Sequence, residues 1–273
     1  MQVRTEAQSF RLAETFTIAR GSRDAAEVLT VHVDSDGVAG RGESVPYARY
    51  GETVESVSEQ VALLAPVLAD LDLETFDLRD HVPPGAARNA VDCALWDWRA
   101  KHGGVRVWEL LSGVAAPEPV QTAFTLSLDT PERMTAAAAR HAHRPLLKIK
   151  LGGADDMARL EAVRHGAPTT PIVIDANEGW TADVYSELAP HLVKLGVMMV
   201  EQPLPAGDDD LLAEIVRPLP VCADESCHDR ASLLALKGKY DMVNIKLDKA
   251  GGLTEALELR RAALAEGFQI MVG

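Results

Sequence analysis

The stretch LLKIK at residues 146–150, followed by PIVIDAN at residues 171–177, sets the pattern that decides the fold. Each stretch is a short apolar run, typical of a buried β-strand, that ends in lysine or carboxylate side chains. The pattern recurs three more times, as MMVEQP at 198–203, PVCADES at 220–226 and DMVNIKL at 241–247. Repeated strands of this kind, each followed by a helix, predict a parallel β/α barrel with its chemistry at the C-terminal strand ends.

The spacing of the terminal polar residues supports this repeat. After Lys150 come Asp175, Glu201, Asp224 and Lys246, at intervals of 25, 26, 23 and 22 residues. Each interval fits one strand plus one helix. Outside the five strands, the patterns predict strands at 120–128 and 268–272 and helices at 154–165, 181–195, 208–216, 229–237 and 253–266.

These patterns give roughly seven strands, one fewer than the eight that close such a barrel. An open parallel sheet would expose two edges that invite association. We therefore expect residues 113–273 to form a modified TIM (β/α) barrel domain whose last βα unit is missing, and the sequence to be part of a longer one. Whether the 273-residue chain is complete or active by itself is left open at this stage.

Residues 1–112 predict a separate, small α+β capping domain. Strands are expected at 9–17, 27–34 and 38–43, and a helix at 53–71 that Pro66 bends or interrupts. A second helix, at 86–101, presents one apolar stripe. Its members are Val91, Ala94, Leu95 and Trp98.

Composition narrows the class of protein. The chain is 47% hydrophobic and 25% charged, which is ordinary for a globular protein. A net charge of −14 argues against nucleic acid and anionic membranes as partners. The three cysteines lack metal-site spacing, and the first ten residues carry no apolar core of signal-peptide length, so we expect a cytoplasmic location. The sequence leaves a homo-oligomer open.

Three carboxylates predict a metal site. Asp175, Glu201 and Asp224 end consecutive strands, so their oxygens can converge on one ion at the barrel rim. Mg²⁺ prefers such oxygen ligands, and no His or Cys joins the three carboxylates at the strand ends, which disfavours zinc. The competing explanation is that each carboxylate merely caps the helix that follows it.

Lysines flank the carboxylates. Lys148 and Lys150 alternate on one strand and so face the same side, toward the barrel interior. Lys246 ends the sixth strand, across the barrel. Lysines on two sides of a metal-bound carboxylate can remove a proton from one face and return it to the other, and a nearby cation would lower their pKa values. The alternative for the first pair is a surface location on an edge strand, and Lys249 is expected to be a loop residue that packs against Gly251 and Gly252.

Together the motifs resemble the muconate-lactonizing branch of the enolase superfamily, and within it the dipeptide epimerases of the L-Ala-D/L-Glu type. The similarity spans nearly the whole chain and is specific for the superfamily, but less so for the epimerases. The similar segments are KIK at 148–150, DAN at 175–177, EQP at 201–203, ADES at 223–226, NIKLDKAGG at 244–252, FTIARG at 16–21, GESVPYARYGET at 42–53 and ARNAVDCALWD at 87–97.

This resemblance implies roles for the site residues. The three carboxylates would bind Mg²⁺, Lys150 and Lys246 would be the acid/base pair, and Lys148 would assist beside the substrate carboxylate. Arg20 would meet an acidic side chain of the substrate, although it could also be a solvated loop arginine. The acidic element that meets the amino group of the dipeptide would lie beyond Gly273, so the exact substrate cannot be read.

The resemblance also leaves alternatives. The main prediction is an epimerase of dipeptides, such as those released from peptidoglycan, which acts through an enolate. The same frame supports a cycloisomerase or another lyase, or an N-acylamino acid racemase. A third possibility is a barrel without catalytic activity. Inversion of the substrate without elimination would separate the epimerase from the lyase.

Overall fold

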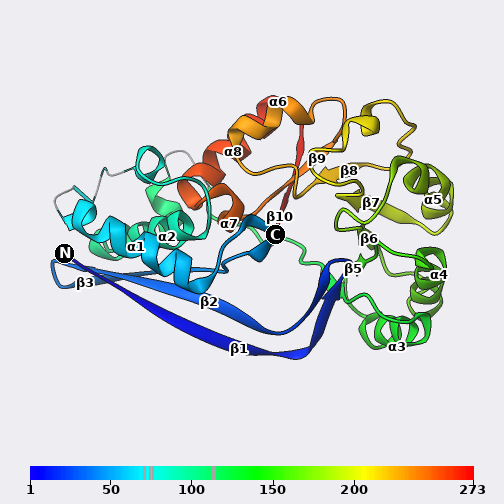
Figure 1. The fold of residues 1–273 in the computed structure, drawn as a ribbon, viewed down its shortest axis with the longest axis horizontal. Coiled ribbons are helices and arrows are strands. Elements are labelled where there is room, and N and C mark those ends of the chain that lie inside the picture. The colour runs from blue at the N-terminus through cyan, green and yellow to red at the C-terminus, as the bar shows by residue number, and fades with distance from the viewer. Residues whose placement is uncertain (70–71, 74, 76, 112–114) are drawn as a thin grey trace.

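The computed structural model describes residues 1–69, 72–73, 75, 77–111 and 115–273. In Figure 1 an N-terminal cap lies beside a sheet of parallel strands, and a long hairpin of the cap reaches under that sheet. The predicted boundary at residues 112 and 113 and the predicted end of the first helix at residue 71 lie outside the described residues. The division into two domains therefore stays a prediction.

In its described residues, the cap consists of three antiparallel strands and two α-helices. The order β1-β2-β3 joins neighbours in sequence, and apolar side chains of β2 pack against both helices. A Cβ at Gly42 would collide with the carbonyl oxygen of Ala90, so glycine permits this close approach of strand and helix. The bounds are β1 Gln2–Ile18, β2 Gly21–Ser35, β3 Val38–Ser44, α1 Val54–Ala69 and α2 Ala86–His102, with short 3₁₀ helices η1 Ala48–Tyr50, η2 Leu78–Asp80 and η3 Val107–Leu110.

Pro66 does not interrupt α1, so of the two predicted effects, a bend or an interruption, the interruption is wrong. The helix continues past it to Ala69, and Pro66 lies on the exposed side. The buried stripe of Val57, Val61, Leu64 and Leu68 holds the helix on the sheet, so tertiary packing outweighs the lost backbone hydrogen bond.

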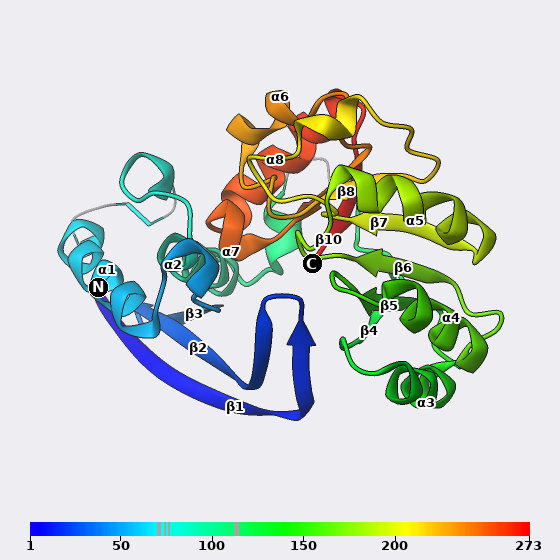
Figure 2. The same cartoon turned by 45° about the vertical axis from the view of Figure 1, so that its right-hand side comes forward.

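The second sheet is parallel and has seven strands, in the order β10-β9-β8-β7-β6-β5-β4. Figure 2 shows that it curls into a half-barrel with helices on its outer side, which confirms the predicted fold class. The strands are β4 Phe124–Leu126, β5 Leu147–Lys150, β6 Ile172–Asp175, β7 Val197–Glu201, β8 Val221–Ala223, β9 Met242–Ile245 and β10 Gln269–Val272, and the helices are α3 Pro131–His141, α4 Asp156–Gly166, α5 Ala182–Lys194, α6 Leu233–Leu236, α7 Leu247–Ala250 and α8 Leu253–Ala265.

Two predicted helices are much shorter than expected. The segment 208–216 contains only the 3₁₀ helix η4, Asp210–Ala213, because Asp209 turns inward to bind Lys239 and Tyr240 instead of capping a helix. The segment 229–237 forms η5, Arg230–Ser232, and then one turn of α6. The first barrel strand is also shorter than predicted. None of the described helices is long and apolar enough to cross a membrane.

Helix α2 joins the cap to the segment that follows β9. Arg88 donates through Nε to the carbonyl oxygen of Gly251 at 3.0 Å and through Nη2 to that of Ala250 at 2.7 Å. Asp92, one turn further along, accepts from the hydroxyl of Thr254 at 2.6 Å. These contacts fix the start of α8 and the end of α7, and thereby the loop that follows Lys246.

Candidate active site

The three predicted metal ligands meet at the rim of the half-barrel. Asp175 lies directly opposite Glu201 in the register of β6 and β7, and Asp224 follows β8 by one residue. Their exposed fractions are 0, 0 and 2%, and one oxygen of each lies within 4.8 Å of the others. Three hard oxygen donors this close, with no competing soft ligand among them, suit a divalent cation such as Mg²⁺. None of the three caps a helix.

The electrostatics of the triad depend on its neighbours. Burial, together with the charge of Asp175, raises the pKa of Glu201 to about 7. Burial also acts to raise the pKa of Asp175 and of Asp224, but neighbouring lysine ammonium groups outweigh it and lower both pKa values. Glu201 is therefore the triad member whose protonation competes with metal binding near neutral pH.

Lys148 and Lys150 are buried beside the carboxylates, with exposed fractions of 8 and 7%. The Nζ atom of Lys148 lies 2.9 Å from Oδ2 of Asp175 and 2.5 Å from Oε2 of Glu201. Lys150 lies opposite Asp175 in the register and binds its Oδ2 at 2.6 Å. The alternative explanation, that Lys148 and Lys150 are surface lysines on an edge strand, is therefore wrong.

Lys246 and Lys249 both bind Asp224. The Nζ atom of Lys246 lies 2.5 Å from Oδ2, and that of Lys249 lies 2.6 Å from Oδ1. The prediction that Lys249 is a loop residue is wrong: it lies in α7 and is 4% exposed. The spacing of three residues in KLDK was the available signal, because one helical turn places both ammonium groups on the same side.

The protein neighbours of Lys246 shift its pKa, and the predicted lowering by a nearby cation stays a prediction. Burial lowers the pKa of Lys246, but the charges of Asp224 and Glu201 outweigh burial and raise it overall. The pKa of Lys148 is raised in the same way, by Glu201 and Asp175. The protein groups alone thus favour charged lysines, and the expected lowering depends on a cation.

Two buried amides, which sequence reasoning did not single out, orient the carboxylates. Oε1 of Gln202 accepts from the backbone N–H groups of Asp224 at 2.9 Å and of Ser226 at 3.1 Å. Asn244 donates to Oε1 of Glu201 at 2.9 Å. Gln202 belongs to the motif EQP and Asn244 to the motif NIKLDKAGG. The sequence does not show which group a polar residue at a strand end will bind, so neither amide could be assigned a partner.

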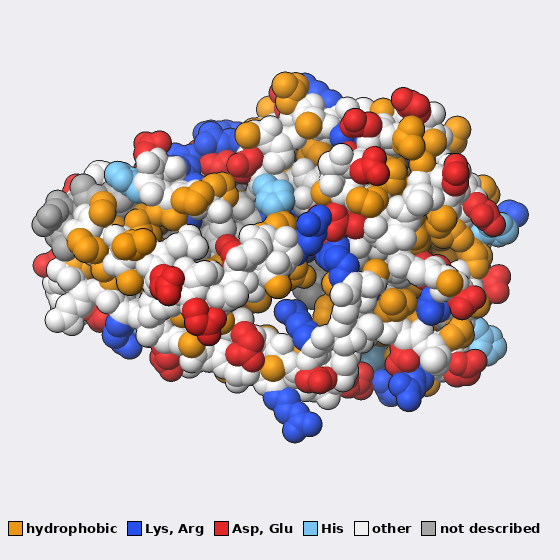
Figure 3. Space-filling view, in the orientation of Figure 1, with side chains coloured by type: hydrophobic (Ala, Val, Ile, Leu, Met, Phe, Trp, Pro, Cys, Tyr) orange, Lys and Arg blue, Asp and Glu red, His pale blue; other side chains and the backbone are white. Residues whose placement is uncertain are grey.

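Two adjoining cavities lie at the site, an outer one lined by the cap and an inner one between the cap and the rim. The outer cavity, of about 570 Å³, is lined by residues 16–27 of the hairpin and 45–49 after β3. The inner cavity, of about 490 Å³, includes Lys150, Asp224 and Lys246 in its wall. Figure 3 shows a hollow near the middle of the visible face, with Lys and Arg side chains at its edge. The two cavities share Phe16, Ile18, Arg23, Val45 and Tyr47 in their walls, so they lie side by side.

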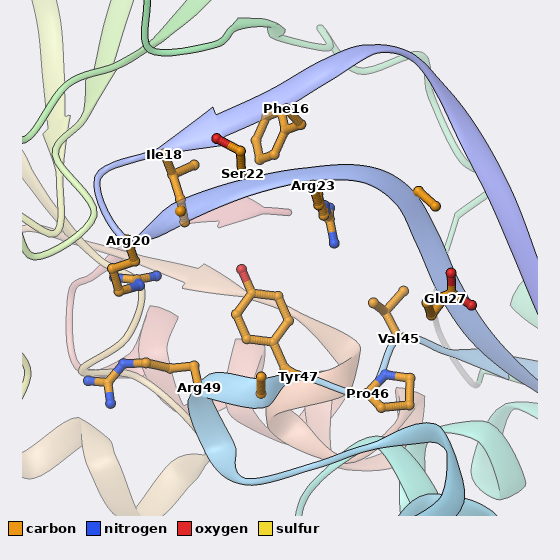
Figure 4. A pocket seen from close by; sticks show the side chains of 13 residues that line it. Phe16, Ile18, Arg20, Ser22, Arg23, Glu27, Val45, Pro46, Tyr47 and Arg49 are labelled. Atoms are coloured by element: carbon orange, nitrogen blue, oxygen red, sulfur yellow. The ribbon is translucent and has the colours of Figure 1, made fainter.

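Arg20 lies at the hairpin tip, on the wall of the outer cavity (Figure 4). Its Nη1 donates to the carbonyl oxygen of Asn177 and to Oε2 of Glu178, both at 2.8 Å, and its Nη2 donates to Oε1 of Glu225 at 2.6 Å. The side chain is 29% exposed. Arg20 is therefore not a solvated loop arginine but a bridge from the cap to two loops of the barrel rim.

The arrangement places the chain in the class of capped β/α barrels, and two family models match it. Residues 1–112 match the N-terminal domain of mandelate racemase and muconate lactonizing enzyme, and residues 131–273 match the enolase C-terminal domain-like family. The chain therefore belongs to the mandelate racemase/muconate lactonizing enzyme family of the enolase superfamily, as its motifs predicted.

Individual relatives are more specific. The chain is 46% identical to the L-Ala-D/L-Glu epimerase of Escherichia coli (strain K12) over 97% of this chain and 83% of that protein. A crystal structure of an enolase family member from Agrobacterium tumefaciens, with bound sodium and L-Ala-L-Glu, superposes with a TM-score of 0.95 at 48% identity, over 99% of this chain and 82% of that one. The structure of a dipeptide epimerase of Enterococcus faecalis V583 complexed with Mg and L-Leu-L-Tyr superposes with a TM-score of 0.93 at 30% identity, over 100% of this chain and 81% of that one.

Proposed function

We propose that the protein is a Mg²⁺-dependent epimerase of dipeptides of the L-Ala-D/L-Glu type, which inverts the α-carbon of the glutamate residue. One observation carries this proposal. Lys150 on β5 and the lysine after β9, Lys246, approach the buried carboxylate triad from strands that β6, β7 and β8 separate. Two lysine side chains on opposite sides of one site suit proton removal by a neutral amine on one face and proton return by an ammonium group on the other.

The metal would be held by Asp175, Glu201 and Asp224, whose oxygens already converge. A bound Mg²⁺ would supply positive charge that stabilises the enolate and opposes the raised pKa values of Lys148 and Lys246. The buried amides of Gln202 and Asn244 keep the triad in place, so little reorganisation is needed when the cation binds.

The lysines perform the proton transfers. For one isomer Lys150 takes the α-proton and Lys246 returns a proton on the other side, and for the other isomer the roles reverse. Lys148, between Asp175 and Glu201, offers positive charge to the substrate carboxylate. Such charges act most strongly where the substrate gains negative charge, so they favour the transition state over the ground state.

Arg20 supports an acidic substrate. A guanidinium group has five N–H donors, and three of them bind Asn177, Glu178 and Glu225. Among the contacts of the described residues, two N–H groups therefore remain for the side-chain carboxylate of a glutamate residue. The relatives from E. coli and A. tumefaciens, which are associated with Ala-Glu dipeptides, support the same class.

The biological setting follows from this class. Dipeptides of alanine and glutamate are products of peptidoglycan breakdown, and we place their epimerisation in the cytoplasm, in keeping with three free cysteines. Nucleic acid and membrane play no part in this proposal. A homo-oligomer is compatible with it and is not needed for the chemistry.

The test is turnover of L-Ala-L-Glu with Mg²⁺ in D₂O, followed by chiral separation and mass spectrometry. We expect L-Ala-D-Glu that carries one deuterium at the glutamate α-carbon. A product formed by elimination or ring closure would indicate a lyase, and selective action on N-acylamino acids would indicate a racemase. Failure to exchange the α-proton of any of these substrates would indicate a barrel without catalytic activity.

A further inference from the structure

Glu178 occupies an unusual position just beyond β6. Its φ is 66°, and that of Asn177 before it is 46°, so two successive residues with a Cβ adopt the left-handed region. This conformation is costly for such residues and persists only where the surrounding contacts hold it. It directs the Glu178 carboxylate toward the cap, where the side chain is 8% exposed.

Four donors hold the Glu178 carboxylate, and they come from three segments. Arg49, in η1, donates twice, through Nε to Oε2 at 3.0 Å and through Nη2 to Oε1 at 2.7 Å. Arg20 donates to Oε2 at 2.8 Å, and the backbone N–H of Ala206 donates to Oε1 at 2.8 Å. The two-fold contact with Arg49 is the strong bidentate kind, whereas Arg20 makes a single contact.

Glu225 is the second carboxylate that binds Arg20, and it is held less well. Its Oε1 accepts from Nη2 of Arg20 at 2.6 Å. Its Oε2 is buried and lacks a hydrogen-bond partner among the described residues. The cluster therefore contains two carboxylates and two guanidinium groups, and its formal charge is balanced only while Arg49 takes part.

We propose that Arg49 is a positioning residue that determines the preference for an acidic substrate: by binding Glu178 it leaves Arg20 with N–H groups free for the side-chain carboxylate of the dipeptide. This inference rests on the proposed function. In Figure 4 the Arg20 and Arg49 side chains lie at the same end of the outer cavity, one from the hairpin tip and one from the segment after β3.

Loss of Arg49 acts on Arg20 in two ways. Glu178 would lose both hydrogen bonds of its bidentate contact, so Arg20 would turn to replace them and use the N–H groups that contact none of the described residues in the parent. The cluster of Arg20, Glu178 and Glu225 would also carry a net negative charge, which repels an anionic side chain. Neither change should alter the binding of a substrate with an apolar second residue.

The experiment compares the parent with Arg49→Met, Arg49→Lys and the double variant Arg49→Met/Glu178→Gln. Each is assayed with L-Ala-L-Glu and with L-Ala-L-Leu in the presence of Mg²⁺. For Arg49→Met we expect KM for L-Ala-L-Glu to rise about tenfold, the loss of one charge-assisted contact, with kcat changed less than about twofold. For L-Ala-L-Leu both constants should stay within about twofold.

The two other variants test whether Arg49 acts through Glu178. Glu178→Gln removes the charge that competes for Arg20, so the double variant should return KM for L-Ala-L-Glu to within about threefold of the parent. Arg49→Lys keeps the charge without the planar fork and should fall between the parent and Arg49→Met. Rescue by a second loss is not what a merely structural Arg49 would give.

Opposing results separate the two proposals. If Arg49→Met weakens both dipeptides equally, or if the double variant is no better than Arg49→Met, Arg49 does not act through Glu178, and the inference is overturned while the epimerase proposal stands. If the parent turns over L-Ala-L-Leu but not L-Ala-L-Glu, the proposed substrate class is wrong and this inference falls with it.

Discussion

The rim and the outer cavity of the same site are built in different ways. At the rim, the functional groups end strands of one sheet, and Asp175 and Glu201 are fully buried in register. At the outer cavity they come from turns and loops, and the side chains of Arg20 and Arg49 are 29 and 37% exposed. A rigid sheet suits proton chemistry that demands fixed geometry, whereas loops can change without disturbing it. Under the proposed function, we therefore expect reaction and substrate selection to reside on separate parts of the fold.

The largest effect is expected from the lysines of the rim. Replacement of Lys150 or Lys246 by Ala should lower epimerisation in both directions by a factor on the order of 10³, because each turnover needs both lysines. Exchange of the α-proton with D₂O should survive for one stereoisomer in each variant, and for opposite isomers in the two. Proton NMR of both isomers measures this, and near-parental epimerisation by both variants would refute a two-base mechanism.

The next effect concerns the metal. Glu201→Gln keeps the shape of the side chain and an acceptor for Asn244, so the fold should survive while Mg²⁺ affinity falls by at least about a hundredfold and activity is lost. Because the pKa of Glu201 is raised to about 7, protons compete with the cation below that pH. Parental affinity should therefore decline as pH falls from 8 to 6.

Calorimetric titration with Mg²⁺ at several pH values measures both effects. The matched control is Glu214→Gln, which removes an exposed carboxylate that is not part of the buried triad. Unchanged Mg²⁺ affinity in Glu201→Gln would remove Glu201 from the metal site.

The sequence could predict the rim but not the outer cavity, for a physical reason. Strand ends such as Lys150, Asp175 and Glu201 are fixed by a local repeat, and the repeat alone places them at one edge of the sheet. Lys249 was predicted to be a loop residue because its one signal, the three-residue spacing from Lys246, is too short to form a periodic pattern. The contact of Arg49 with Glu178 joins residues 129 positions apart. Glu178 has a left-handed backbone conformation, but a glutamate in the sequence does not predict that conformation.

A smaller effect is expected at the hairpin tip. Arg20→Met should raise KM for L-Ala-L-Glu by about thirtyfold, because a charge-assisted, bidentate contact is lost, and should leave a dipeptide with an apolar second residue nearly unaffected. Steady-state kinetics with the two substrates give the ratio. An equal rise in KM for both dipeptides would mean that the outer cavity supports the chemistry at the rim. Reaction and substrate selection would then not reside on separate parts of the fold.

The smallest effect is expected at Asp248, in the seam where the wall of the cavity meets the rim. Asp248, two residues after Lys246, accepts from Nδ2 of Asn89 at 2.6 Å and from the backbone N–H of Val45 at 3.2 Å, and so ties the cavity wall to the rim. Burial raises its pKa from 3.8 to about 6. A carboxyl group whose pKa is higher in the folded state binds protons more readily there, so its contribution to stability is present below about pH 4 and is lost as pH rises through 6.

Asp248→Asn removes this titration. Relative to the parent, the variant should gain about 1 kcal/mol in free energy of unfolding between pH 4 and pH 7, a modest value because the side chain is only partly buried. Urea unfolding followed by circular dichroism at several pH values measures the difference between the two proteins, in which titrations common to both cancel. If parent and variant change in parallel with pH, Asp248 is not the titrating link, and the seam is held instead by contacts that do not titrate, such as the backbone carbonyl groups that bind Arg88.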